Sequence, residues 1–263
     1  MPRFAANLSM LFGEVPFLDR FAAAARCGFR GVEFLFPYEW PAEEVARAAR
    51  DARVEVALFN LPAGDWTRGE RGLGALPGRE ADFAAALEQA IHYAKALACP
   101  RVHVMAGLVP ADATRAACEA TFLANLRMAA PRLAAAGLTG MLEPLNTTDV
   151  PGYLHNRTDH ALGYVAAVGS PALSLQLDLY HVQIMEGDLA RKVEGLAGRY
   201  AHVQIAGNPG RNEPDVGEVN FPFVFDTFDR IGYEGWIGCE YRPKTTTEAG
   251  LGWAAAYGIA APR

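Results

Sequence analysis

The sequence predicts an α/β protein, a (β/α)8 TIM barrel that residues 1–263 form as a single domain. Three observations predict it. Short β-branched or aromatic runs alternate with long alanine-rich stretches, the alternation repeats eight times, and the composition does not change between the halves. Strands separated by helices run parallel, and eight right-handed crossovers close into a barrel. A doubly wound open sheet is the main alternative, but no strand is followed by the Gly-x-Gly-x-x-Gly turn of a dinucleotide site.

The strands are expected where β-branched and aromatic residues form short runs that glycine, proline or asparagine ends, because these residues favour turns. The expected strands are 4–8, 31–36, 54–60, 101–107, 139–146, 173–178, 200–207 and 235–241.

The helices are expected in the alanine-rich stretches between these strands. Gly28 follows the first helix, as glycine commonly does at a helix C-terminus, and Pro41 opens the second. The expected helices are 17–27, 41–52, 80–97, 113–136, 155–168, 188–196, 221–232 and 246–257. A long loop, 61–80, is rich in glycine and carries Trp66, which is typical of a lid that excludes water.

Composition excludes several classes of protein. Apolar residues make up 51% of the chain and charged residues 21%, which excludes a disordered chain. The net charge of −6 lacks the basic excess of a nucleic-acid binder, so no nucleic-acid partner is expected. No apolar run approaches the ~20 residues that span a membrane. The four scattered cysteines indicate a reducing compartment, and we expect a cytoplasmic protein.

Four expected strands end in an acidic or amide side chain, at Glu143, Asp178, Gln204 and Glu240. These residues are spaced by about one strand–helix unit each, so they should lie at one mouth of the barrel, where the active sites of such barrels lie. Any one of them alone would more often cap a loop or pair with arginine. Together, however, such acceptors would repel one another without a cation among them. Their oxygen atoms suit a divalent metal ion, Mg²⁺ or Mn²⁺.

Three cationic or titratable residues follow strands at the same mouth. His181 comes three residues after Asp178, Arg211 lies in the loop after the seventh strand, and Arg71 lies in the long loop. A solvated surface position is the commoner fate of such arginines. In an acidic protein, however, an anionic substrate needs local cations. His103, His202 and Glu33 are expected to be interior residues held by hydrogen bonds or an ion pair.

Several motifs, in order and spacing, resemble the hydroxypyruvate isomerase family, including 2-oxo-tetronate isomerase, within the xylose isomerase-like TIM barrel superfamily. The motifs are GDWTRGERGLGALPGRE, MLEPLN, LQLDLYH, HVQIAGNPGRNEP and GCEYRP. The resemblance implies that Glu143, Asp178, Gln204 and Glu240 bind the metal. Related ketose epimerases have histidine at the position of Gln204, which favours the hydroxypyruvate-type branch.

The resemblance also implies an activity: interconversion of hydroxypyruvate and tartronate semialdehyde, or of the related 2-oxo-tetronate pair, through a cis-enediolate. Glu143 and Glu240 would be the acid/base pair. His181 and Arg211 would orient the oxygens of a small anionic hydroxy-oxo acid, and Arg71, or else Lys244, would hold its carboxylate. A ketose 3-epimerase, a metal-dependent hydrolase or endonuclease, and a non-catalytic barrel remain alternatives. A homodimer or homo-oligomer is also left open.

Overall fold

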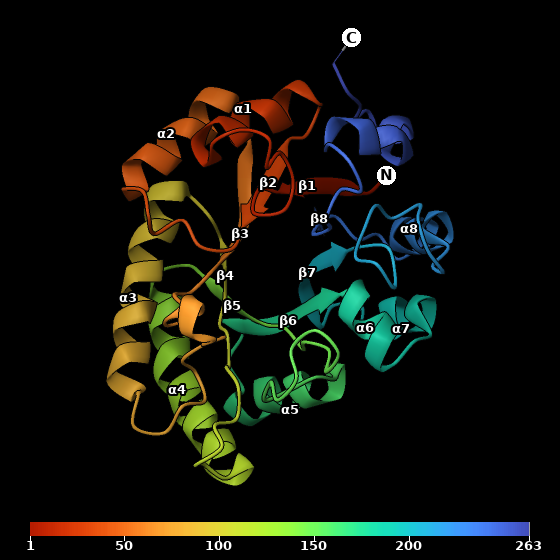
Figure 1. Ribbon diagram of the computed structural model, residues 1–263. Coiled ribbons are helices and arrows are strands. Elements are labelled where there is room, and N and C mark those ends of the chain that lie inside the picture. Colours follow the sequence, from red (N-terminus) through yellow and green to blue (C-terminus); the bar gives the residue numbers. More distant parts are fainter. Residues whose placement is uncertain (263) are drawn as a thin grey trace.

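A computed structural model describes residues 1–262 as a closed barrel of eight parallel strands that follow one another in chain order (Figure 1). β1 pairs with both β2 and β8, with Arg3 opposite Trp236, and this pairing closes the barrel. The predicted fold class is confirmed. The strands are β1 (Arg3–Asn7), β2 (Gly31–Phe34), β3 (Glu55–Asn60), β4 (Arg101–His103), β5 (Thr139–Leu142), β6 (Leu173–Asp178), β7 (Tyr200–Ile205) and β8 (Trp236–Cys239).

Helices form the outer layer around the strands (Figure 1). Local chemistry fixes several of their ends. The Thr114 hydroxyl accepts a hydrogen bond from the Ala117 amide at the start of α4, and Glu43 and Glu44 lie in the first turn of α2, where acids are favourable. The helices are α1 (Phe17–Arg26), α2 (Ala42–Ala52), α3 (Glu80–Leu97), α4 (Arg115–Ala135), α5 (Thr158–Val168), α6 (Leu179–Met185), α7 (Leu189–Gly195), α8 (Phe221–Arg230) and the 3-10 helices η1 (Trp66–Arg68) and η2 (Glu248–Tyr257). Among the described residues, no helix is both long and apolar enough to cross a membrane.

The structure differs from the sequence prediction at the barrel mouth. β4, β5 and β8 are only three or four residues long and end at His103, Leu142 and Cys239, before the ends that the sequence predicts. The short helix α6 replaces an expected loop, because Asp178, the last residue of β6, accepts a hydrogen bond from the Tyr180 amide at 2.8 Å. The last helix is a 3-10 helix rather than an α-helix.

Aromatic and aliphatic side chains fill the layer between the strands and the helices, whereas the interior of the barrel holds polar groups. Asn7, Glu33, Gln176, His202 and Gln204 are all at most 2% exposed. Bulky branched residues usually fill such an interior. The buried polar groups must therefore satisfy one another through hydrogen bonds.

Candidate active site

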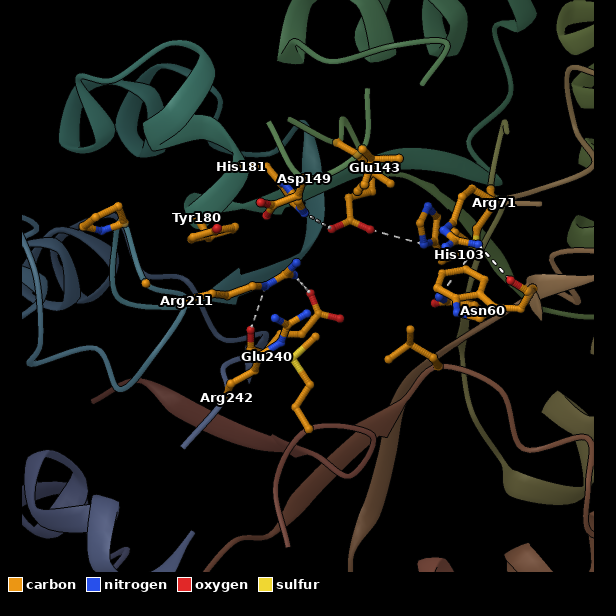
Figure 2. A pocket seen from close by; sticks show the side chains of 18 residues that line it. Asn60, Arg71, His103, Glu143, Asp149, Tyr180, His181, Arg211, Glu240 and Arg242 are labelled. Atoms are coloured by element: carbon orange, nitrogen blue, oxygen red, sulfur yellow. Dashed lines mark hydrogen bonds and ion pairs between the residues drawn. The ribbon is translucent and has the colours of Figure 1, made fainter. Parts of the chain in front are cut away.

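A cavity of about 620 Å³ lies at the carboxyl ends of the strands, and Figure 2 shows the side chains around it. Its charged residues come from loops that are far apart in the sequence. Its polar lining is Asn60, Arg71, His103, Glu143, Asp149, Tyr180, His181, Arg211, Glu240 and Arg242. The mouth predicted from the strand ends therefore holds a polar cavity.

Three buried side chains at this mouth could hold a metal ion. Glu143 follows β5, Asp178 ends β6 and His181 lies in α6, and each offers one ligand atom within 4.8 Å of the others. Oε1 of Glu143 is buried and has no hydrogen-bond partner among the described residues. A buried carboxylate oxygen of this kind needs a cation or a donor. The chemistry of the site therefore fits a divalent ion.

The acids at the mouth keep their protons more strongly than free carboxyl groups do. Burial raises the pKa of Glu143 well above its usual range, and the charges of Glu240 and Asp178 add to this shift. Burial likewise raises the pKa of Glu240 to about 8, against the opposing effect of Arg211. Burial also raises the pKa of Asp178. A carboxyl group with a raised pKa is suited to exchange protons near neutral pH.

Arg211 connects two of these acids. Its Nη2 atom donates to Oε2 of Glu240 at 2.6 Å and lies 3.4 Å from Oδ2 of Asp178, and the dashed line to Glu240 is drawn in Figure 2. Burial opposes the guanidinium charge, but Glu240 and Asp178 raise the pKa of Arg211 overall. The backbone of Arg211 has a φ of 52°, in the left-handed region that most side chains avoid. The loop thus directs a permanent positive charge into the cavity.

The hydrogen bonds of His181 determine which of its ring nitrogens carries the proton. The backbone N–H of Asn146 donates to Nδ1 of His181 at 3.1 Å. Burial lowers the pKa of His181 well below its usual value, with a further contribution from Arg211, so the ring is neutral. Since Nδ1 accepts, the proton is on Nε2, which lies 3.5 Å from Oδ2 of Asp178. This tautomer presents a donor to the site, which suits contact with a substrate oxygen better than ligation of a metal.

Gln204 lies beside Asp178 across β6 and β7, but its amide forms hydrogen bonds within the barrel. Its Nε2 atom donates to Glu33 at 2.8 Å, and its Oε1 atom accepts from Gln176 at 2.6 Å. Glu143, Asp178 and His181 therefore lie close together, and Arg211 links Glu240 to Asp178. Gln204 pairs with Asp178 across the two strands, while its amide forms hydrogen bonds inside the barrel.

Arg71 lies across the cavity from Arg211 (Figure 2). Its guanidinium stacks on Trp66 with 3.9 Å between the guanidinium carbon and the ring centroid, and it donates to the backbone carbonyl of Glu70. No carboxylate among the described residues forms an ion pair with it. Lys244, the alternative from the sequence, is exposed and lies outside the cavity lining.

The sequence interpretation missed five polar residues of the cavity, one of which is Asn60 at the end of β3. His103 was expected only as an interior residue, yet its Nδ1 atom lies 3.3 Å from Oε2 of Glu143. The ring of Tyr180 packs against the guanidinium of Arg211, and Asp149 and Arg242 complete the wall. The position of His103 at the end of β4 was the available signal, since residues at such ends meet at the mouth.

Comparison with known proteins agrees with this geometry. The chain is 57% identical to the 2-oxo-tetronate isomerase of Cupriavidus necator, over 98% of this chain and 99% of that protein. It is 46% identical to the hydroxypyruvate isomerase of Escherichia coli, over 98% and 100%. Both relatives are matched over nearly their full length.

Among solved structures, a crystal structure from Brucella melitensis described as an AP endonuclease of family 2 superposes with a TM-score of 0.95. It has 51% sequence identity and covers 98% of this chain and 99% of that one. An L-ribulose 3-epimerase with a TM-score of 0.76 and 23% identity, covering 97% of this chain and 86% of its own, shows the shared fold alone. The sequence profile of the xylose isomerase-like TIM barrel matches residues 21–257. The chain belongs to the xylose isomerase-like TIM barrel family and is similar in sequence to hydroxypyruvate and 2-oxo-tetronate isomerases.

Proposed function

We propose that the protein is a metal-dependent isomerase that interconverts hydroxypyruvate and tartronate semialdehyde or the related 2-oxo-tetronate pair. The observation that carries the proposal is the pair of buried acids with raised pKa values, Glu143 and Glu240, in one cavity with three arginines. The names of the relatives at 57% and 46% identity support the same reaction.

The metal site of this proposal is formed by Glu143, Asp178, Glu240 and the amide oxygen of Gln204. The unpartnered Oε1 atom of Glu143 and the mutual repulsion of the acids support a cation among them. Hard oxygen ligands favour Mg²⁺ or Mn²⁺. When bound, the ion would act as a Lewis acid that stabilises negative charge on the substrate oxygens.

The two glutamates move the proton in this proposal. One removes a proton from a substrate carbon, and the other delivers a proton to the adjacent carbon. The hydroxyl proton of the first carbon moves to the oxygen of the former carbonyl, so that carbonyl and hydroxyl exchange positions. The reaction is reversible, and the acid and base exchange roles with its direction. In the metal-free protein both glutamates have raised pKa values, which suits groups that take up and release protons.

The remaining cavity residues bind and orient the substrate. His181 donates from Nε2 to a substrate oxygen, because Asn146 occupies its Nδ1 atom. Arg211 stabilises negative charge that develops beside Glu240. Arg71 holds the substrate carboxylate, since it has no acid partner of its own and lines the cavity.

A DNA-cleaving role, suggested by the description of the Brucella structure, fits this chain less well. The net charge is −6, whereas a protein that binds the phosphodiester backbone of DNA usually carries a basic excess.

The test measures isomerisation of hydroxypyruvate and of 2-oxo-tetronate, with proton exchange followed in heavy water. Glu143→Gln and Glu240→Gln are each expected to lower kcat at least about 100-fold while the protein remains folded. Glu55→Gln, at an exposed position in β3, is the matched control and should keep the parent rate. If either site variant folds, binds Mn²⁺ and isomerises at the parent rate, the two-glutamate scheme is wrong.

A further inference from the structure

Glu33 lies inside the barrel and is hydrogen-bonded to three side chains. Asn7 Nδ2 donates at 2.9 Å and Gln204 Nε2 at 2.8 Å, both to Oε1, and His202 Nε2 lies 2.6 Å from Oε2. These groups come from β1, β2 and β7. Glu33 is 1% exposed and is not among the residues that line the cavity. The structure thus places Glu33 in the interior, in contact with His202, as expected from the sequence.

A glycine on β8 leaves space for this carboxyl group. Gly238 lies opposite Gln204, and a Cβ atom there would collide with Oε2 of Glu33. Such a contact cannot be accommodated without moving the carboxyl group. The glycine at this position therefore makes room for Glu33.

The Glu33 carboxylate determines which way the amide of Gln204 points. A carboxylate only accepts hydrogen bonds, so Gln204 must turn its Nε2 toward Glu33 and its Oε1 away from it. The Oε1 atom then accepts from Gln176 and has a second lone pair left. The amide oxygen, rather than the nitrogen, is thereby the atom of Gln204 that keeps a free lone pair, as the proposed metal site requires.

The same carboxylate also orients Glu240. Nδ2 of Asn7 donates both to Oε1 of Glu33 and, at 3.2 Å, to Oε1 of Glu240. The Oε2 atom of Glu240 is held by Arg211. Asn7 thus fixes one oxygen of the proposed acid/base residue from below while the other faces the cavity.

We propose that Glu33 is a positioning residue: its carboxylate sets the orientation of the Gln204 amide and, through Asn7, that of Glu240. This inference rests on the proposed metal-dependent isomerase and adds a buried acid on β2 to its machinery. Partners that orient metal ligands typically change metal affinity or activity 10- to 100-fold when they are removed.

The decisive variant is Glu33→Leu, which keeps roughly the size of the side chain and removes both acceptor oxygens. The Nε2 donor of Gln204 then has no acceptor at this end, so nothing holds the amide in its present orientation. Gln176 can follow a turned amide, because its Oε1 atom has no hydrogen-bond partner among the described residues. Mn²⁺ affinity and kcat are each expected to fall about 10-fold or more. Mn²⁺ alone, titrated into the metal-free protein by calorimetry, gives the affinity without turnover.

The conservative variant Glu33→Gln separates orientation from packing and from charge. Its amide oxygen can still accept from Asn7 and Gln204 while its nitrogen faces Nε2 of His202, because His202 can carry its proton on the unpartnered Nδ1 atom instead. Mn²⁺ affinity in Glu33→Gln should therefore stay within about threefold of the parent. Asn7→Ala should lower kcat while Mn²⁺ affinity falls less than in Glu33→Leu. Glu55→Gln again serves as the control.

The outcomes distinguish the two proposals. If Glu33→Leu is folded, binds Mn²⁺ and turns over like the parent, or if Glu33→Gln loses as much Mn²⁺ affinity as Glu33→Leu, the positioning role is wrong. If Glu33→Leu does not fold, Glu33→Gln and Asn7→Ala decide, and a parent-like kcat in Asn7→Ala or a loss of about 10-fold in Mn²⁺ affinity in Glu33→Gln overturns the role. If the parent itself binds no Mn²⁺, the proposed metal-dependent function fails instead.

Discussion

In the metal-free protein, Glu240 is expected to remain largely protonated at pH 7, because burial raises its pKa to about 8. In the unfolded chain the same group has its ordinary pKa near 4.5 and is ionised. Between these two values the folded state therefore binds one more proton than the unfolded state. The free energy of unfolding consequently falls as pH rises through this range, and it levels off above the folded-state pKa.

The magnitude follows from these two values. Between pH 7 and 8, the Glu240 contribution falls by about 1 kcal/mol, which corresponds to roughly 2–4 °C in Tm for a protein of this size. Binding of a divalent ion needs the ionised carboxylate, so Mn²⁺ affinity should rise about fivefold over the same interval. Glu240→Gln removes this proton, and its unfolding free energy should depend less on pH.

The assay is chemical unfolding of the metal-free parent and of Glu240→Gln at both pH values. The difference between the two slopes isolates Glu240, because the four buried cysteines and the buried tyrosines are common to both proteins. Equal slopes for the parent and the variant would refute the reasoning, and so would a parent whose stability rises from pH 7 to 8.

Three further predictions follow from single contacts. His155 is buried and stacked on Phe122, and burial lowers its pKa to about 3, so its protonation in the unfolded chain should remove about 2 kcal/mol of stability as pH falls from 7 to 5. In urea unfolding, His155→Phe should make the unfolding free energy depend less on pH between about 7 and 5. The control His160→Phe, at an exposed position, should keep the pH dependence of the parent. Equal pH dependence in the parent and in His155→Phe would contradict the role given to His155. Arg71→Ala should raise KM for the anionic substrate at least about tenfold and keep kcat within about threefold of the parent. Arg68→Ala, on the same loop but outside the cavity, should leave both constants unchanged. An unaltered KM in Arg71→Ala would exclude Arg71 as the carboxylate site. Gly238→Ala should weaken Mn²⁺ binding about tenfold, because the new Cβ displaces Glu33. The control Gly163→Ala lies in helix α5, has no atom within 4 Å of its new Cβ, and should raise Tm slightly. Parent-like Mn²⁺ affinity in Gly238→Ala would contradict the argument that Gly238 makes room for Glu33.

The barrel was predictable from the sequence because its signals are local. The alternation of β-branched runs with alanine-rich stretches sets eight strand–helix units, and strand β6 and helix α3 begin and end where the sequence predicts. Glu143, Asp178 and Glu240 were found because residues at strand ends converge in a parallel barrel. The helix α6 was missed, since its seven residues carry too short a pattern and depend on one capping contact from Asp178.

Contacts between residues far apart in the chain were beyond the sequence. The pairing of His202 with Glu33 joins positions 169 residues apart, and the link from Asn7 to Glu240 spans 233 residues. No periodicity records which way an amide such as Gln204 turns. That choice depends on whether an acceptor or a donor lies beside it, and only the closed barrel brings Glu33 and Gln176 to its two ends.

An anionic substrate approaches a chain of net charge −6, so attraction must come from local cations rather than from the protein as a whole. Arg71, Arg211 and Arg242 line the cavity with Glu143, Asp149 and Glu240, which makes the lining balanced in formal charge. Two of the arginines have no carboxylate partner among the described residues, whereas Arg211 already pairs with Glu240 and Asp178. In the proposed mechanism the unpaired cations offer binding energy to the substrate carboxylate, and the paired one holds Glu240 and Asp178 in place. Such a division would let one small cavity hold an anion beside acids that accept and release a proton.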